Sequence, residues 1–425
     1  MSSGQGMACP PANANALRIL TWNVNGLRPM LNRNVYSLSR MLRELQADII
    51  CIQETKLSKS DMNTLHTLGT AEGWSSYFSF CTYRSGYAGV ATFSKNSTAL
   101  PLAAEDGLCG TAAPQNSKMK GSASEGVAFN PEDPYWSRYK KEELEMIDNQ
   151  GRCVITDHGA FCLFNVYGPA VTNELSERFA FKMRFYQVLK HRMEALLQAG
   201  RSVVLAGDLN IAPFPIDHCD LVRASRAEQE SMLRARADRA WFRNALQSAE
   251  GPFVDLFRKF HPNRLKSYTV WNMKTNARPR NHGSRVDFIL AASGQRAPAS
   301  GSSSSDTPDK SEESLRFEDC FTDCRIWFEY EGSDHAPVWA DLQLPEPLPR
   351  GAKPPSLDVS NRQSSSGQRQ LTNMFSAHVF SKKRAATEAE ADMQQKPKVG
   401  KTQRRHEDTP ERDGLDDVFS ERFMR

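Results

Sequence analysis

The sequence predicts an α/β domain over residues 17–344, followed by a disordered tail over residues 345–425. Within the domain, short β-rich runs alternate with segments of helical periodicity. Beyond it, five prolines open a stretch of Ser, Gln, Lys, Arg and Glu with few aromatic residues. Such a stretch cannot bury enough apolar area to offset the entropy cost of ordering it. We also expect the small and polar residues 1–16 to be disordered.

The elements of the domain follow from local patterns. Seven β-rich runs predict strands at residues 17–23, 48–54, 160–166, 202–206, 285–290, 324–330 and 338–344. Apolar residues at helical spacing predict a helix over residues 35–45 and a longer one over residues 176–198. Residues 109–126 and 293–314 are rich in small and polar residues, and strand-like patterns resume after each. We therefore expect them to be flexible surface inserts within one domain.

The formal net charge is only +4 over 425 residues, so charge alone does not indicate a nucleic-acid binder. Any affinity for phosphate must come from local patches and a bound cation. The nine cysteines form no regular framework, and residues 1–16 lack the regions of a secretory signal. We therefore expect reduced thiols, and Cys320 and Cys324 lack the second pair that a zinc site would need. No run is long enough to span a membrane, so we expect no membrane partner. We also expect a monomer.

The most informative feature is a set of polar residues at the ends of predicted strands. They are Asn23, Glu54, Tyr167, Asp208 with Asn210, Asp287, and Asp334 with His335. Taken singly, each is most simply a turn residue, a helix cap or a packed tyrosine. A packed sheet tolerates such side chains together only where they meet a metal, an anion or each other. Their joint occurrence predicts metal-assisted chemistry on a phosphate.

Seven segments resemble the exonuclease III-type AP endonucleases, a family within the endonuclease–exonuclease–phosphatase superfamily. They are residues 20–28, 52–56, 83–91, 165–167, 207–210, 283–288 and 332–338, in family order. The resemblance implies a four-layer α/β sandwich with two packed mixed sheets flanked by helices. It also implies hydrolysis of DNA phosphodiesters within base excision repair.

Three segments narrow the resemblance, because they look like the eukaryotic AP endonuclease 2 branch of this family. They are residues 79–93, 181–186 and 215–218. Asn25 and Ser284 agree with that branch, because the dominant branch carries Asp and Trp at the matching positions. Ser284 would leave a looser abasic-sugar pocket, walled also by Val270 and Val286. We therefore expect 3′–5′ exonuclease and 3′-end-cleaning activity beside AP-site incision, on duplexes with abasic sites, nicks or recessed 3′ ends.

The resemblance implies that Mg²⁺ or Mn²⁺ binds at these strand ends. Glu54 offers the oxygen donor that such hard cations prefer. The metal shell would draw on Asn23, Glu54, Asp208, Asn210, Asp334 and His335, with Asp334 as a more distant or alternate ligand. The cation would neutralise a nonbridging or leaving oxygen of the phosphodiester.

The resemblance also assigns catalytic roles. Asp208 would orient and deprotonate the attacking water, and Asn210 would fix its geometry and contact the phosphate. His335, oriented by Asp287, would hydrogen-bond the phosphate and stabilise charge in the transition state. Tyr167 would donate a hydrogen bond to the same phosphate.

Contacts to DNA are expected from basic residues in loops beside these motifs. Arg84 and Arg278 are the candidates, with Lys274 and Arg280 near them. Ordinary solvated charge is an equally good explanation for all of them except Arg278, which lies in a family match.

The tail carries two further patterns. Gln368, Leu371, Met374 and Phe375 resemble the motif that binds the sliding clamp (PCNA), with Met374 where an aromatic residue is usual. A chance apolar cluster is the alternative. Lys382, Lys383 and Arg384, followed by Lys396 and Lys398, resemble a bipartite nuclear import signal and predict a nuclear protein.

Two other functions stay open at this level. The first is another phosphoesterase of the superfamily, such as an inositol-phosphate phosphatase, a sphingomyelinase or a deadenylase, and residues 83–91 and 283–288 favour DNA over these substrates. The second is a catalytically silent clamp-binding scaffold, which has no reason to keep every polar strand-end residue.

Overall fold

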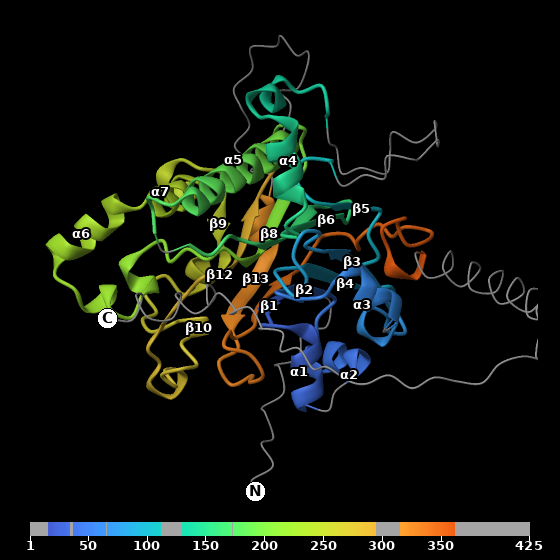
Figure 1. Cartoon of the computed structure of the whole chain (residues 1–425), viewed down its shortest axis with the longest axis horizontal. Helices are drawn as coiled ribbons and strands as arrows, with labels where there is room; N and C mark the ends of the chain where they lie inside the picture. The colour runs from blue at the N-terminus through green and yellow to red at the C-terminus, as the bar shows by residue number, and fades with distance from the viewer. Residues whose placement is uncertain are drawn as a thin grey trace, which may run out of the picture. The chain divides into compact units, whose positions relative to one another are not determined.

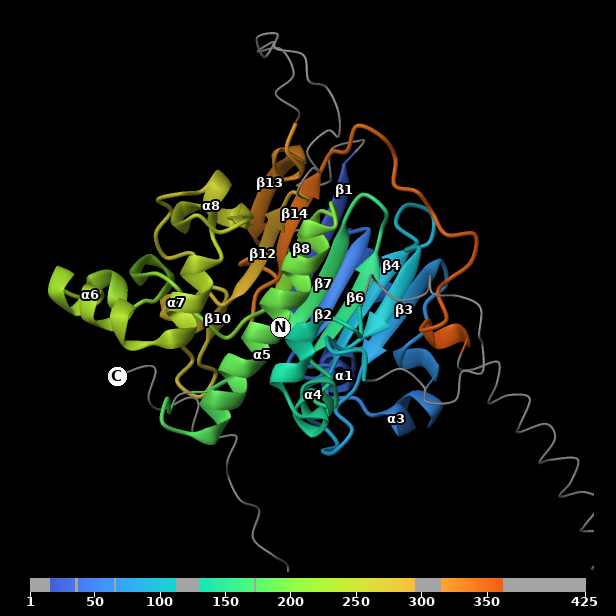
Figure 2. The same cartoon turned by 90° about the horizontal axis from the view of Figure 1, so that it is seen from above.

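A computed structural model of the chain describes residues 16–34, 37–64, 66–111, 130–171, 173–294 and 315–361. Two six-stranded mixed sheets pack against each other, and helices cover their outer faces (Figures 1 and 2). This confirms the predicted α/β architecture. None of the described helices is long and apolar enough to cross a membrane, and the eight described cysteines are buried free thiols.

The first sheet has the strand order β13-β14-β1-β2-β4-β3. Its strands are β1 (Leu17–Asn23), β2 (Ile49–Gln53), β3 (Trp74–Ser79), β4 (Val90–Lys95), β13 (Phe321–Ile326) and β14 (Val338–Leu342). Only β1 and β2 pair in parallel. Their carboxyl ends therefore lie at one edge of the sheet, where Asn23 and Gln53 are neighbours in register.

The second sheet has the order β5-β6-β7-β8-β12-β9. Its strands are β5 (Ala103–Asp106), β6 (Cys153–Asp157), β7 (Cys162–Tyr167), β8 (Val203–Asp208), β9 (Val254–Asp255) and β12 (Asp287–Ala292), and a separate pair is formed by β10 (Val270–Trp271) and β11 (Gly283–Ser284). Here β7 and β8 pair in parallel, and Tyr167 lies beside Asp208. The antiparallel β12 places Asp287 opposite Asp208.

Eight helices surround the sheets in the described residues, and α8 contacts strands of both sheets. They are α1 (Leu27–Asn34), α2 (Leu38–Glu44), α3 (Lys59–Thr64), α4 (Lys141–Asp148), α5 (Glu177–Gln198), α6 (Arg226–Ala235), α7 (Ala237–Asn244) and α8 (Leu256–Phe260). Short 3₁₀ turns are η1 (His66–Leu68), η2 (Pro134–Arg138), η3 (Pro215–Asp217), η4 (Leu221–Arg223), η5 (Gln247–Ala249), η6 (Arg278–Arg280) and η7 (Phe317–Cys320). Helices α1 and α2 pack on the first sheet and α5 on the second.

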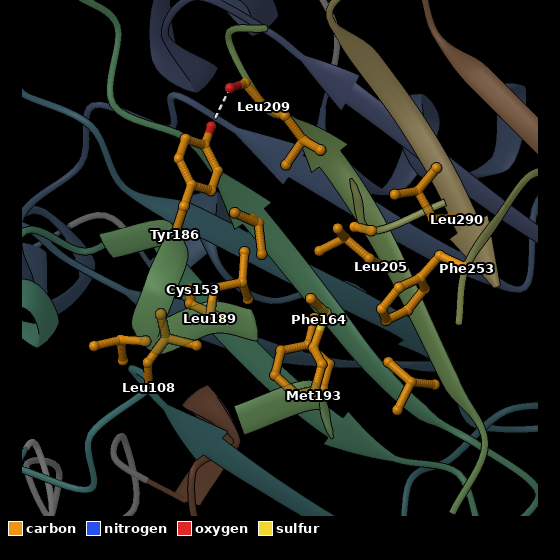
Figure 3. Packing of buried hydrophobic residues seen from close by; sticks show 14 of the residues in the cluster. Leu108, Cys153, Phe164, Tyr186, Leu189, Met193, Leu205, Leu209, Phe253 and Leu290 are labelled. Carbon is orange, nitrogen blue, oxygen red and sulfur yellow. Dashed lines mark hydrogen bonds between the residues drawn. The ribbon is translucent and has the colours of Figure 1, made fainter. Parts of the chain in front are cut away.

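Helix α5 confirms the predicted long helix over residues 176–198. It starts where the Ser176 side chain accepts a hydrogen bond from the backbone N–H of Phe179. Its buried stripe includes Leu189 and Met193, which pack with Phe164 of the sheet below (Figure 3). This stripe fixes the rotation of α5 over β7 and β8.

Strands β2, β7, β8, β12 and β14 differ from their predicted bounds by one or two residues at an end, and β13 differs by more. Strand β12 begins at Asp287 instead of residue 285, because the backbone N–H groups of Arg285 and Val286 donate to Asp217 and Thr269 instead of to a strand. Strand β13 spans residues 321–326 instead of 324–330, because Trp327 opens a turn. Strands β3 to β6 and β9 to β11 had no prediction, nor had helices α1, α3, α4 and α6 to α8.

The middle of the interface between the sheets is polar. The Gln53 side-chain amide donates to Asn165 Oδ1 over 2.8 Å, and the Asn165 amide donates to the carbonyl oxygen of Ala91 over 2.9 Å. Both side chains are fully buried. Directed bonds of this kind allow one relative placement of the two sheets and so align their edges.

The compact unit extends beyond the predicted boundary at residue 344 and ends at Ser360. Asp358 accepts a hydrogen bond from the backbone N–H of Ser76 over 2.9 Å, and Val359 joins the core of the first sheet beside Gly69. We call residues 345–360 the strap. Its composition did not predict that it packs on the domain, because its few apolar residues lie among prolines and polar residues. Residues 1–15, 112–129, 295–314 and 362–425 lie outside the described residues, so disorder predicted there stays a prediction.

A buried ion network lies behind the edge formed by Asp208 and Asp287. The fully buried Arg285 donates to Asp217 over 2.8 Å and to Asp255 over 2.7 Å. Arg258 donates to Asp217 as well, over 2.6 Å. The network ties η3 and β9 to the start of β12.

We expect Asp217→Asn to lower the free energy of unfolding by about 3–5 kcal/mol, because it leaves the buried guanidinium groups incompletely paired. Urea unfolding would measure the loss. The control is Glu230→Gln, which breaks an exposed pair with Arg226 and should cost only about 0.3–0.5 kcal/mol. Equal losses in the two variants would contradict this account.

Candidate active site

The Asn23 side chain joins a polar residue from each of the two sheets. The Asn23 side-chain amide donates to Glu54 Oε1 and to Asp208 Oδ2, each over 2.9 Å. Asn23 and Asp208 are buried, and the Glu54 side chain is 18% exposed. Three of the predicted site residues therefore form one cluster, which opens to solvent at Glu54.

The backbone at this cluster takes conformations that side chains rarely adopt. Glu54 and Asn210 have φ values of +52° and +50°. Such values are unusual for Glu and tolerated by Asn. Gly207 has φ +155°, and a Cβ there would lie 1.9 Å from the carbonyl oxygen of Val166. The glycine of the Gly-Asp-Leu-Asn motif is thus required by the close approach of β7.

Helix α5 holds the Gly207–Asn210 turn from behind. The fully buried Lys182 donates to the carbonyl oxygen of Asn210 over 2.8 Å and pairs with Asp238 over 2.8 Å. The Tyr186 hydroxyl donates to the carbonyl oxygen of Leu209 (Figure 3). Sequence reasoning missed Lys182 and Asp238 as site residues. The available signal was a lysine beside the apolar stripe of an otherwise amphipathic helix.

His335 is held in one orientation. Its Nδ1 lies 2.9 Å from Asp287 Oδ2, its Nε2 lies 4.0 Å from Asp208 Oδ2, and its carbonyl oxygen accepts from the Trp22 indole. Burial alone would lower the pKa of His335, but Asp287 and Asp208 raise the pKa to about 10. The imidazole is therefore protonated at neutral pH.

Asp208 sits between this imidazolium and the Asn23 amide. Burial and the nearby Asp287 carboxylate raise its pKa to about 7, and His335 and Asn23 limit the rise. Its Oδ1 accepts from the backbone N–H of Asn210 over 2.8 Å. A carboxylate with a pKa near the working pH is suited to accept and return a proton.

Glu54 is kept ionised. Burial would raise its pKa, but Lys56 at 3.1 Å, the Asn23 amide, His335 and the Tyr167 hydroxyl together lower it. The Tyr167 hydroxyl donates to Glu54 Oε1 over 2.9 Å. Burial and Glu54 raise the pKa of Tyr167, so it remains a hydrogen-bond donor. Lys56 is a third site residue that sequence reasoning missed, after Lys182 and Asp238.

Asp334 joins the cluster indirectly. Its Oδ1 accepts from the Asn25 amide over 3.1 Å, and Asn25 Oδ1 in turn accepts from Lys56 over 2.7 Å. Ser333 donates to the carbonyl oxygen of Asn23 over 2.7 Å, which fastens the Ser-Asp-His turn to β1. The turn that contains Asn23 and Asn25 is therefore hydrogen-bonded to the Ser-Asp-His turn, which lies about 310 residues later in the chain.

The donor set fits a hard divalent cation. Glu54 and Asp208 present carboxylate oxygens to one shared amide. Asp208, Asp287 and His335 place one polar atom each within 4.8 Å of one another, but protonated His335 has no free lone pair and lies beside the carboxylates as a cation. Asp287 Oδ1 is buried without a hydrogen-bond partner. Asn23, in contrast, turns its amide nitrogen to both carboxylates, while its oxygen accepts from the backbone of Asn25.

The residues expected to wall a sugar pocket lie beside His335. Val270 pairs with Ser284 between β10 and β11, and Val270 also bridges to His335. Val286 is buried next to them, with 8% of its surface exposed. The wall holds two valines and a serine.

The expected DNA-contacting arginines differ in their surroundings. Arg84 is exposed and lies 5.1 Å from the ring of Tyr87. Arg278 donates to three carbonyl oxygens, those of Ser333, Phe328 and Tyr330, over 3.0, 2.8 and 2.8 Å. The Arg278 guanidinium thus braces the turn before Asp334. The clamp-binding and import residues lie outside the described part of the chain.

Comparison with known proteins agrees with this geometry. The sequence profile of the Endonuclease/Exonuclease/phosphatase family matches residues 20–116 and 121–335. The chain is 37% identical over 353 residues to the Homo sapiens protein named DNA-(apurinic or apyrimidinic site) endonuclease 2, covering 77% of this chain and 60% of that protein. It is 30% identical to the Saccharomyces cerevisiae protein of the same name, covering 81% and 70%.

A solved structure gives the same result. The crystal structure of the Xenopus laevis APE2 catalytic domain matches with a TM-score of 0.65 and 35% identity, over 80% of this chain and 96% of that domain. The chain spans only 60% of the human relative's length. On these matches, the chain belongs to the endonuclease/exonuclease/phosphatase family and, within it, to the AP endonuclease 2 group.

Proposed function

We propose that the chain is a metal-dependent DNA repair nuclease that removes 3′ nucleotides, cleans blocked 3′ ends and incises abasic sites. The observation that carries the proposal is the joining of Glu54, Asp208 and the His335–Asp287 pair at one edge of both sheets. The names of the relatives support a DNA substrate. They include an Exodeoxyribonuclease of Bacillus subtilis, 27% identical over 76% of this chain and 98% of that protein.

In this proposal Mg²⁺ or Mn²⁺ is held by Glu54 and Asp208, with Asp334 behind them, and supplies positive charge to the phosphodiester oxygens. Asp208 orients the attacking water and accepts its proton. Asn210 donates to the carbonyl oxygen of Gly168 over 3.0 Å, which fixes its amide beside Asp208.

The phosphate would meet two donors that the chain holds in place. Protonated His335 stabilises the negative charge that develops on the phosphate, and Asp287 fixes the ring by its bond to Nδ1. The Tyr167 hydroxyl would exchange its bond to Glu54 for one to the phosphate. A silent scaffold has no need of this arrangement, and the intact geometry therefore argues for an enzyme.

The proposal extends to the setting in which the enzyme works. The clamp motif at Gln368, Leu371, Met374 and Phe375 would direct it to DNA bound by PCNA, and the basic pairs would direct it to the nucleus. Eukaryotic relatives are consistent with this. The catalytic unit would comprise residues 17–360, because the strap packs into its core.

We expect Asp208→Asn and His335→Ala each to lower the rate of hydrolysis by about 10²–10³-fold or more, because each removes a preorganised group at the reacting phosphate. The assay is digestion of 3′-recessed, nicked and abasic duplexes with Mg²⁺ or Mn²⁺. Glu230→Gln on the exposed face of α6 is the control and should retain full activity. Activity close to that of the unmodified chain in a folded Asp208→Asn or His335→Ala variant would contradict the assignment.

The rate should show a bell-shaped dependence on pH. The active form needs Asp208 ionised and His335 protonated, so the rate rises with pH as Asp208 loses its proton and falls as His335 loses its proton. The pKa values of about 7 and about 10 apply without metal, and a cation held by Asp208 shifts the acid limb to lower pH. A pH–rate profile at saturating Mg²⁺ would measure both limbs. In His335→Gln the residual rate should lose the alkaline limb, and a limb that persists in that variant would assign it to another group.

We expect Ser284→Trp to raise the ratio of abasic-site incision to 3′-nucleotide removal by about tenfold, because the indole would fill the wall beside Val270. Parallel assays on one abasic and one recessed duplex give the ratio directly. Ser284→Ala is the matched control and should leave the ratio unchanged. A ratio that also stays unchanged in Ser284→Trp would show that this wall does not set the preference.

A further inference from the structure

Lys56 is a charged residue of the site that the proposed reaction does not use. Its ammonium nitrogen lies 3.1 Å from Glu54 Oε2 and donates to Asn25 Oδ1 over 2.7 Å. The Lys56 side chain is 36% exposed, so it borders the opening of the site at Glu54. An ammonium group carries three donors, and these two contacts take two of them. The third can serve an acceptor that enters from solvent.

The backbone around Lys56 is held in an unusual conformation. Lys56 and Glu54 both have φ +52°, which is rare for residues with long side chains. The backbone N–H of Lys56 donates to the carbonyl oxygen of Ala88 over 2.9 Å, and the N–H of Gly26 donates to the carbonyl oxygen of Glu54 over 2.8 Å. Two neighbouring segments thus hold this turn. Conformations of this kind cost free energy and cluster at functional sites. Here the turn directs the Lys56 side chain back to Glu54.

The two carboxylate oxygens of Glu54 have different neighbours. Oε1 accepts from the Asn23 amide and from the Tyr167 hydroxyl, each over 2.9 Å. Oε2 faces Lys56 instead. A divalent cation bonded to Oε2 at about 2.0–2.1 Å would lie within roughly 5 Å of the ammonium nitrogen. Two positive charges at that separation repel each other. Lys56 and the cation therefore compete for Oε2.

We propose that Lys56 is a phosphate-binding residue that Glu54 holds until a divalent cation binds. The inference rests on the proposed hydrolysis of DNA. Once the cation takes Oε2, Lys56 keeps its bond to Asn25 and turns its released donors toward a nonbridging oxygen of the phosphodiester. Its flexible four-carbon stem allows this movement without a change in the backbone. Cation and DNA then strengthen each other's binding, because each draws Lys56 away from Glu54.

The first test measures DNA binding instead of hydrolysis. Fluorescence anisotropy gives the affinity of the full chain for a recessed duplex with a phosphorothioate at the scissile linkage, with and without Mn²⁺. We expect Mn²⁺ to tighten binding about tenfold more in the unmodified chain than in Lys56→Met. Lys56→Arg keeps the positive charge and should keep most of this coupling. The matched control is Lys59→Met, which removes an exposed charge three residues away in α3 and should keep all of it.

Metal binding without DNA gives a second readout. Electron paramagnetic resonance of free Mn²⁺ measures its affinity, which should rise by about tenfold in Lys56→Met because the competing ammonium group is gone. Lys59→Met should bind Mn²⁺ as the unmodified chain does. Full coupling between Mn²⁺ and duplex in Lys56→Met would overturn the inference, and so would an unchanged Mn²⁺ affinity. Digestion of an ordinary duplex by the unmodified chain tests the proposed nuclease separately, and cleavage there would leave that proposal standing.

Discussion

The bond network around Asn23 is the constraint on which the site depends. Its amide donates to a carboxylate from each sheet, Glu54 from the first and Asp208 from the second. Two carboxylates that approach so closely would repel each other without a shared donor. The amide, Lys56 and protonated His335 together offset that repulsion. The sheets can therefore close at this edge, and the site exists only when they do.

The same edge is rigid because neighbouring elements hold it from outside. Lys182 and Tyr186 hold the two carbonyl oxygens that follow Asp208. Arg278 braces the turn that carries Asp334 and His335. None of these three side chains needs to touch substrate. They fix the backbone in conformations, such as φ +50° at Asn210, that an isolated chain would leave.

Sequence patterns located the polar residues that meet at this edge more closely than they located the strands around them. Polar residues at strand ends are local signals, and every such residue reached the Asn23 cluster or the Asp287–His335 pair. Strand β13 was misplaced because Trp327 and Tyr330 look β-prone, yet their rings pack on each other in a turn, with centroids 4.4 Å apart. Lys182 and the strap around Asp358 depend on partners distant in sequence, which periodicity cannot reveal.

Asn25 shows how one neutral residue changes the electrostatics of the edge. It accepts from Lys56 and donates to Asp334, so it links a cation to an anion without adding charge. An Asp at this position, as in the dominant branch of the family, would add a negative charge and draw Lys56 away from Glu54. With Asn25, Lys56 remains 3.1 Å from Glu54 Oε2. At the proposed metal site a divalent cation would therefore compete with an ammonium group for that oxygen, in a field weaker by one charge than Asp would give.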